Sequence, residues 1–267
     1  MEQPLPRPRK RFGQNFLHDT AVIERIVAEL SISSETALLE IGPGRGALTH
    51  RLLEQTERLV AVEIDRHLAQ HLRDTFAEPR LTVVEEDILE VDFARLGQAI
   101  HRRQVRWTIA GNLPYNISKP VAMRLVESVA SIDRAVLMFQ REVAQRLCAV
   151  PGGADYGPLS VLPRAVYEID RVMDVSPEAF RPRPAVVSTI TRWLARVERP
   201  STDELAQLRA TLRAAFSNRR KTLRNNVRQA LGSERVLEQA GLDGARRAQE
   251  LSPEEFHALA AYWPRVP

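Results

Sequence analysis

A glycine-rich turn between an apolar run and a helical segment constrains the fold of this chain more than any other feature. The turn, Glu40–Gly46, follows a short apolar run and precedes Ala47–Glu54, whose apolar residues have helical spacing. Its glycines permit backbone dihedrals that a Cβ would forbid, and they let a ligand approach the backbone closely. Gly42, Gly44 and Ala47 match the glycine pattern of dinucleotide-binding sheets. We therefore expect a Rossmann-like sheet that holds an adenosine-type cofactor.

Apolar runs alternate with helical segments along the first half of the chain. The expected strands lie near 37–41, 59–63, 81–85, 107–111 and 135–139. This alternation predicts a parallel, doubly wound α/β sheet. Two later runs, 165–175 and 185–194, are close enough in the chain to pair antiparallel, and they would complete a set of seven strands.

Acidic residues stand at or just after the ends of three of these strands. Glu40 precedes the glycines, where a carboxylate can face a positively charged ligand and would repel a pyrophosphate. Glu63 lies about 20 residues past the first glycine, where a ribose-binding carboxylate is expected. Asp87 can accept a hydrogen bond from an adenine amine, and Ile88 can cover the ring. These acids favour S-adenosylmethionine over NAD as the cofactor.

The segment Asn112–Tyr115 follows the fourth expected strand and points to nucleobase chemistry. The exocyclic amine of a base is a poor nucleophile, because its lone pair is delocalised into the ring. Asn112 can offer its side-chain oxygen and Leu113 its carbonyl to the two amine hydrogens. Pro114 has a fixed φ and stiffens the loop, while Tyr115 offers a face for a flipped-out base. The alternative interpretation of this tetrapeptide is an ordinary turn.

Segments spread over nearly the whole chain resemble the small-subunit ribosomal RNA adenine N6,N6-dimethyltransferase family. The phenylalanine-rich segment near the start and the proline-rich segment after residue 180 are the most particular to that family. No motif position departs from the family pattern in a way that threatens catalysis. The matching segments are Arg11–Leu17, Glu40–Gly46, Asp87-Ile88, Asn112–Tyr115, Gln140–Ala144, Tyr156–Ser160, Phe180–Ser188 and Phe216–Leu223.

The resemblance implies a role for each residue on the cofactor side of the site. Gly42 would line the methionine part of S-adenosylmethionine, and Glu63 would hold the ribose hydroxyls. Asp87 and Ile88 would hold the adenine. The residues expected to contact the cofactor are Asn15, Leu17, Gly42, Gly44, Glu63, Asp87, Ile88 and Asn112.

The resemblance also implies the residues that handle the target base. Asn112 and the carbonyl of Leu113 would hold the amine, within a loop that Pro114 stiffens, and Tyr115 would stack on the base. Phe180 is similar in place to an aromatic residue that closes the other side of the base. The alternative for Phe180 is a core aromatic residue.

Two domains are expected, with a boundary at Arg199-Pro200-Ser201. Residues 1–198 would form the seven-stranded methyltransferase domain with a basic N-terminal segment, and residues 199–267 a small helical RNA- or ribosome-docking domain. Ser201 with Glu204, and Ser252 with Glu255, have the spacing of capping boxes that open helices. Amphipathic spacing between Asn218 and Leu231 predicts another helix.

Positive charge is concentrated in the second half of the chain. The segment Arg181–Ala230 holds twelve Lys or Arg and three Asp or Glu, a net charge of +9, whereas the whole chain carries +4. Such a concentration attracts a phosphate backbone. A second basic cluster is Arg7–Arg11, and the alternative in both places is a solvated surface. The residues expected to bind RNA are Arg219, Arg220, Lys221, Arg224 and Arg228.

The expected activity is the transfer of methyl groups to two adjacent adenines of a small-subunit rRNA hairpin. The expected partner is this rRNA in a pre-ribosomal particle, met by a monomer. The single cysteine, Cys148, excludes an internal disulfide, and we expect no metal. No apolar run approaches the roughly 20 residues that span a bilayer. Without a secretory signal either, we expect a cytoplasmic enzyme.

Other functions remain open at this point. An NAD-dependent dehydrogenase would use the same glycine turn but leaves Asn112–Tyr115 unexplained. A non-catalytic ribosome-assembly or nucleic-acid-binding protein would use the basic surface alone. Among methyltransferases, the alternatives are a large-subunit rRNA enzyme of the macrolide-resistance type and a DNA adenine methyltransferase. The segment Phe180–Ser188 and the helical C-terminal part favour the small-subunit enzyme.

Overall fold

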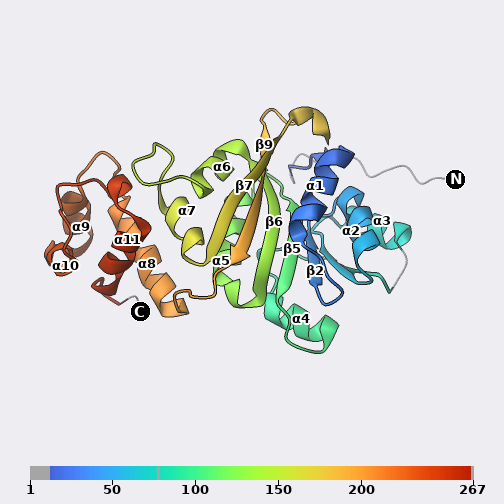
Figure 1. Cartoon of the computed structure of the whole chain (residues 1–267), viewed down its shortest axis with the longest axis horizontal. Helices are drawn as coiled ribbons and strands as arrows, with labels where there is room; N and C mark the ends of the chain where they lie inside the picture. Colours follow the sequence, from blue (N-terminus) through green and yellow to red (C-terminus); the bar gives the residue numbers. More distant parts are fainter. Residues whose placement is uncertain (1–12, 77–78, 266–267) are drawn as a thin grey trace. The chain divides into compact units, whose positions relative to one another are not determined.

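The computed structural model describes residues 13–76 and 79–265. Within these residues the chain forms two compact units. The first comprises the described parts of Met1–Ala144 together with Glu168–Ala195, and the second comprises Gln145–Tyr167 together with the described part of Arg196–Pro267. Figure 1 shows the helices and strands of both units along the chain.

A seven-stranded mixed sheet forms the centre of the first unit, in the order β4-β3-β2-β5-β6-β9-β7. Strands β2 to β6 are parallel to one another, and β9 runs antiparallel to β6. The predicted α/β fold with seven strands is confirmed. The strands are β2 (Ala37–Ile41), β3 (Leu59–Val62), β4 (Leu81–Val84), β5 (Trp107–Asn112), β6 (Ile132–Gln140), β7 (Tyr167–Val175) and β9 (Ser188–Ala195).

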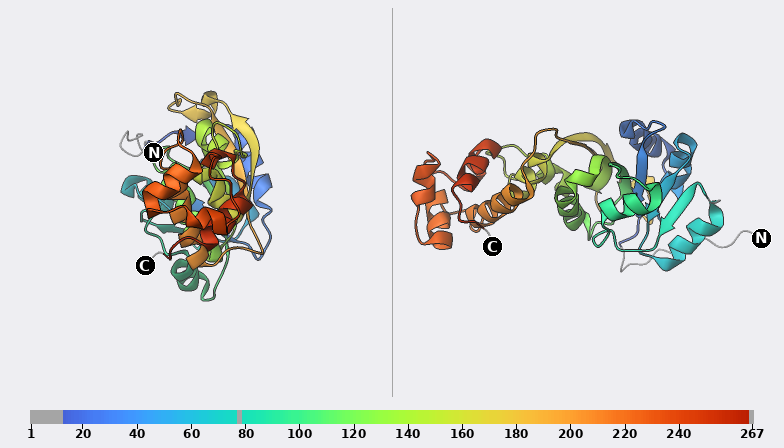
Figure 2. Two further views of the ribbon diagram at one scale, coloured as in Figure 1. Left: turned by 90° about the vertical axis from the view of Figure 1, so that its left-hand side faces the viewer. Right: turned by 90° about the horizontal axis from the view of Figure 1, so that it is seen from below.

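Helices lie on both faces of this sheet (Figures 1 and 2). They are α1 (Thr20–Leu30), α2 (Ala47–Gln55), α3 (Arg66–Thr75), α4 (Phe93–His101), α5 (Ser118–Glu127) and the start of α6 (Arg141–Leu147). Helix α1 shows why they pack there: its buried residues Val22, Ile23, Ile26 and Leu30 recur at helical spacing along one face. Asp19 caps its first turn by accepting from the backbone of two residues.

The turn between β2 and α2 requires glycine for two reasons. Gly44 and Gly46 have φ angles of 60° and 83°, in the left-handed region. In addition, a Cβ on Gly44 would lie 3.0 Å from the ring of Phe16, and one on Gly46 would lie 2.7 Å from the ring of Phe76. Only glycine therefore lets the turn adopt these angles and pack this closely against both rings.

A separate two-stranded sheet joins the start of the described chain to the segment after residue 179. Strand β1 (Phe16–Leu17) pairs antiparallel with β8 (Phe180–Arg181), and Leu17 lies opposite Phe180. Both of these side chains are buried in the core of the first unit. This pairing attaches the segment before α1 to the rest of the unit.

The second unit is helical. Its helices are the end of α6, α7 (Pro158–Val161), α8 (Thr202–Ala215), α9 (Leu223–Leu231), α10 (Arg235–Gln239) and α11 (Pro253–Ala261). Both predicted capping boxes are confirmed, at Ser201 with Glu204 and at Ser252 with Glu255. Within the described part of the chain, no helix has the length and apolar character needed to span a membrane.

The second unit also contains residues 145–167, which the expected boundary at residue 199 placed in the first domain. Residues 145–167 pack with the C-terminal helices, so a single cut in the chain does not describe this unit. The ring of Tyr156 meets the ring of Phe216 edge-on, with centroids 6.4 Å apart. The backbone N–H of Gly152 donates to the carbonyl of Gln249 at 2.7 Å. These contacts join residues far apart in the sequence.

Candidate active site

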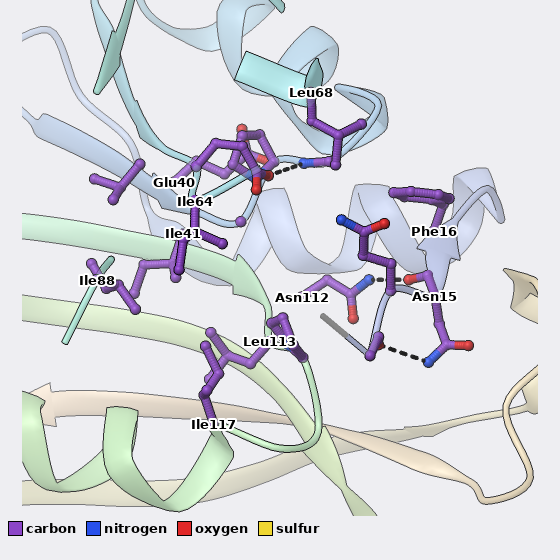
Figure 3. Close-up of a pocket in the computed structure, with 18 of the residues that line it drawn as sticks. Asn15, Phe16, Glu40, Ile41, Ile64, Leu68, Ile88, Asn112, Leu113 and Ile117 are labelled. Atoms are coloured by element: carbon purple, nitrogen blue, oxygen red, sulfur yellow. Dashed lines mark hydrogen bonds between the residues drawn. The ribbon is translucent and has the colours of Figure 1, made fainter. Parts of the chain in front are cut away.

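A cavity lies at the carboxyl edge of the sheet, where β2, β3, β4 and β5 end. Its walls come from residues 13–17, the glycine turn with the start of α2, the end of β3 with the start of α3, and residues 86–88 and 112–117. Figure 3 shows side chains from these segments around it. The cavity brings together every residue predicted to contact the cofactor: Asn15, Leu17, Gly42, Gly44, Glu63, Asp87, Ile88 and Asn112.

Asn112 is held at the end of β5 by a residue from the start of the chain. Its side-chain Nδ2 donates to the backbone carbonyl of Asn15 at 2.9 Å (Figure 3). The side chain of Asn15 in turn donates to the carbonyl of Gly13 at 3.2 Å. This bond orients the amide, so that Oδ1 can serve as an acceptor at the cavity that Asn112 lines.

The residues after Asn112 form a tight turn that lines the cavity. The carbonyl of Pro114 accepts from the backbone N–H of Ile117 at 3.2 Å, so the chain turns directly into α5. Leu113 is buried, and Tyr115 is half-buried with its hydroxyl 2.8 Å from Oγ of Ser188. Burial raises the pKa of Tyr115, so its phenol stays protonated at neutral pH. All four residues predicted for this loop lie at the cavity.

Glu63 connects the end of β3 to the glycine turn. Its Oε2 accepts from the backbone N–H of Gly44 at 3.1 Å, and its Oε1 accepts from the N–H of Asp65 at 2.9 Å. The side chain is only 5% exposed. Burial raises the pKa of Glu63, while these backbone donors lower it. The carboxyl therefore lines the cavity in a fixed position.

Glu40 is the second buried carboxyl at the cavity, with 2% of its surface exposed. Its Oε2 accepts from the hydroxyl of Thr49 at 2.6 Å. Burial is the main cause that raises the pKa of Glu40 to about 8; the bond from Thr49 opposes this shift and the charge of Glu63 adds to it. Glu40 therefore holds a proton near neutral pH in the free protein, and a positively charged ligand beside it would favour its ionised form.

Apolar side chains also line the cavity. Ile88 is buried beside Asp87, whose Oδ1 accepts from the N–H of Leu89 at 3.0 Å. Ile64 also lines the cavity and is 47% exposed, which is unusual for a large apolar residue. The sequence interpretation did not include Ile64, although its position directly after the strand-end acid Glu63 was a usable signal. An adenine ring fits between apolar side chains of this kind.

Two further contacts at the cavity were not expected from the sequence. The guanidinium of Arg45 lies over the ring of Phe16, 4.4 Å from its centroid. The side-chain amide of Gln14 donates to Oδ2 of Asp65 at 3.3 Å. Both contacts tie the segment before α1 to the cofactor side of the cavity, and neither has a signature in local sequence.

Phe180 does not line this cavity, and its role beside the target base stays a prediction. Its side chain is 2% exposed and belongs to the core cluster of the first unit. The physical reason is the pairing of β8 with β1, which places Phe180 opposite the buried Leu17. The alternative interpretation, a core aromatic residue, describes this structure.

The basic residues expected to bind RNA fall into three groups. Arg219 donates to the carbonyls of Tyr156 and Ala154, both at 2.8 Å, and so supports the fold of its own unit. Arg224 and Arg228 form ion pairs with one acid, Glu234, at 2.9 and 3.1 Å.

Arg220 and Lys221 make up the third group and are exposed just before α9. The predicted helix from Asn218 begins only at Leu223, because Thr222 caps it and Asn218 accepts from the backbone N–H of Arg220 at 3.0 Å. The other basic cluster, Arg7–Arg11, lies outside the described residues. Which of these residues contact RNA stays a prediction.

Comparison with known proteins places the chain in a family. The model of the family described as ribosomal RNA adenine dimethylase matches residues 6–264. The Ribosomal RNA small subunit methyltransferase A of Leptothrix cholodnii is 46% identical over 253 residues, which cover 94% of this chain and 90% of that protein. The protein of the same name from Aromatoleum aromaticum is 41% identical over 258 residues, covering 96% and 94%.

Solved structures agree with this assignment. A dimethyladenosine transferase from Plasmodium falciparum matches with a TM-score of 0.75 at 24% identity. The match covers 91% of this chain and 95% of that chain, and it shows a similar fold. The 23S rRNA methyltransferase ErmE has a TM-score of 0.69 at 25% identity and covers 93% and 99%. With the family model matching nearly its whole length, this chain belongs to the ribosomal RNA adenine dimethylase family.

Proposed function

We propose that this protein transfers methyl groups from S-adenosylmethionine to the N6 amines of two adjacent adenines in a small-subunit rRNA hairpin, giving N6,N6-dimethyladenosine. The observation that carries the proposal is the bond between Asn112 and the carbonyl of Asn15, which presents Oδ1 of Asn112 as an acceptor beside the cavity. Membership of the family and the names of the relatives support the substrate.

The residues around the cavity fit S-adenosylmethionine. Glu63 can accept from the ribose hydroxyls, and Asp87 can accept from the adenine amine, with Ile64 and Ile88 against the ring. Glu40 suits the positively charged end, because a cation beside this buried carboxyl favours its ionised form, whereas the negative charge of a pyrophosphate would not. When bound, the cofactor supplies a methyl group that its positive sulfur makes electrophilic.

The chain itself positions and polarises the target amine. Asn112 Oδ1 and the carbonyl of Leu113 accept the two amine hydrogens and draw the nitrogen towards a pyramidal geometry. Tyr115 gives the base a surface on which to stack. Because these contacts strengthen as the nitrogen becomes pyramidal, they act on the transition state. The proton leaves the nitrogen for water or a carbonyl, so the reaction needs no strong base.

We further propose that the substrate is this RNA within a pre-ribosomal particle, and that the enzyme is a cytoplasmic monomer. The exposed Arg220 and Lys221 support docking on a structured RNA, since each cation that meets a phosphate adds to the affinity.

Mass spectrometry of ribosomal RNA from cells lacking this protein tests the substrate. We expect the dimethyladenosines of the small-subunit RNA to disappear and to return when the wild-type chain is supplied. The nucleosides of the large-subunit RNA serve as the internal control. Loss of a methyladenosine from the large-subunit RNA alone would replace our proposal with the macrolide-resistance type of activity.

A further inference from the structure

A hydrogen bond connects the loop at the target base to strand β9. The hydroxyl of Tyr115 lies 2.8 Å from Oγ of Ser188, 73 residues further along the chain. Tyr115 lines the cavity, whereas Ser188 is the first residue of β9 and has no exposed surface. The bond therefore runs from the wall of the cavity into the buried sheet.

Backbone pairing holds Ser188 in place. It pairs with Gln140 in the antiparallel ladder between β9 and β6. The residue before it, Val187, accepts from the backbone N–H of Arg141 at 3.0 Å. With the backbone held on both sides, the hydroxyl of Ser188 has a single torsion left to adjust. The phenol of Tyr115 is thus anchored at its far end, and the ring cannot swing about its side-chain torsions without breaking this partly buried bond.

We propose that Ser188 is a positioning residue that holds the ring of Tyr115 for the target adenine, and that it matters more for the second methyl transfer than for the first. This inference rests on the proposed function. It adds a residue to the site and says which of the two methyl transfers depends on that residue more. Ser188 lies outside the lining of the cavity, so it acts through Tyr115 and not on the substrate.

The difference between the two transfers follows from counting hydrogens on the amine. An unmodified amine has two hydrogens, which satisfy both Oδ1 of Asn112 and the carbonyl of Leu113. A monomethylated amine has one hydrogen, so one of these acceptors loses its partner. The base is then positioned less by hydrogen bonds and more by stacking on Tyr115. Any loosening of the ring should slow the second transfer most, because the geometry of attack must be held closely.

The neighbouring residue Thr189 offers a matched control. It is also fully buried in β9, and its hydroxyl donates to Oδ1 of Asp174 at 2.7 Å, outside the lining of the cavity. Ser188→Ala and Thr189→Val each remove one buried hydroxyl from the same strand. A merely structural role would give the two variants similar behaviour.

The experiment is a single-turnover time course that resolves mono- and dimethyladenosine in small-subunit RNA. Ser188→Ala should slow the second transfer by about tenfold and the first by less than about threefold, so that monomethyladenosine accumulates. Thr189→Val should leave the ratio of the two rates unchanged. Cofactor affinity, measured by calorimetry, should not change in either variant.

Two further measurements separate positioning from stability. Tyr115→Phe keeps the ring and removes its hydroxyl, so the double variant Tyr115→Phe with Ser188→Ala should behave like Tyr115→Phe alone. The bond from Ser188 lowers the pKa of Tyr115. Ser188→Ala should therefore raise that pKa in the NMR titration of labelled tyrosine, and Thr189→Val should not.

The proposal is overturned if Ser188→Ala keeps the wild-type ratio of the two rates, or if Thr189→Val alters that ratio equally. Should Ser188→Ala fail to fold, Tyr115→Phe alone must still accumulate monomethyladenosine, and a normal product ratio from it overturns the proposal as well. If the wild-type chain makes no methyladenosine at all, the proposed function itself is wrong, which is a separate outcome.

Discussion

The side-chain amide of Asn112 donates to the backbone carbonyl of Asn15 across 97 residues of sequence. This bond joins the end of β5 to residues 13–17, and both segments line the cavity. The same segment reaches the start of α3, where Gln14 donates to Asp65. These two bonds tie residues 14 and 15 both to the end of β5 and to the start of α3.

Replacing Glu63 should weaken cofactor binding. Glu63→Ala removes a charged acceptor and leaves the backbone N–H groups of Gly44 and Asp65 without their partners. We expect the loss to be about 1.5–3 kcal/mol of binding free energy by calorimetry. Glu63→Gln, which keeps one acceptor oxygen, should fall between the wild type and Glu63→Ala. Unchanged affinity in Glu63→Ala would remove this residue from the cofactor site.

The buried carboxyl of Glu40 should make the stability of the free protein depend on pH. Burial raises its pKa from 4.5 to about 8, so the folded chain holds a proton that the unfolded chain releases between these values. The stabilisation is therefore present at low pH and is lost as the pH rises through about 8. In thermal unfolding without ligand, the Tm of Glu40→Gln should rise relative to the Tm of the wild type between pH 5.5 and pH 8.5. A constant difference between the two Tm values would show that Glu40 does not titrate in this way.

Arg219 should contribute to folding more than to RNA binding. Its guanidinium donates to the carbonyls of Tyr156 and Ala154 and joins the 145–167 segment to the turn before α9. Arg219→Ala should lower the free energy of unfolding by about 1–2 kcal/mol. The adjacent Arg220→Ala is the control and should stay within about 0.5 kcal/mol of the wild type. Equal stability of the two variants in a denaturant titration would contradict this assignment.

Removing Arg220 and Lys221 together should weaken docking on the small subunit. Both are exposed, and two lost phosphate contacts would reduce the slope of log affinity against log salt by up to about 2. Arg228→Ala is a useful comparison, because Arg228 is already paired with Glu234. Cofactor affinity should be unaffected in every variant. If the double variant binds small subunits normally at each salt concentration, docking resides elsewhere.

The sequence was informative wherever function is tied to the end of a strand. Parallel strands bring their carboxyl ends to one edge of the sheet, so the sequence alone predicts that Glu63, Asp87 and Asn112 lie at one site. The glycine turn was equally readable, because its left-handed φ angles demand glycine. Capping boxes were found correctly since they depend only on residues three apart.

The features that sequence reasoning missed depend on contacts between distant segments. The inward position of Phe180 follows from the pairing of β8 with β1, which no local pattern encodes. The structural role of Arg219 needs carbonyls more than 60 residues away, at positions 154 and 156. The packing of residues 145–167 on the C-terminal helices has the same origin. Charge and hydropathy patterns report the surroundings of a residue along the chain, not its partners in space.

The most direct test of the account compares the wild type with Asn112→Ala on small-subunit RNA supplied as ribonucleoprotein. The wild type should convert two adjacent adenines to N6,N6-dimethyladenosine, and Asn112→Ala should slow methyl transfer by about 10²–10³. RNA affinity should change far less, since the lost acceptor acts on the transition state. Near-normal turnover by Asn112→Ala, or binding of NAD in place of S-adenosylmethionine by the wild type, would contradict the account.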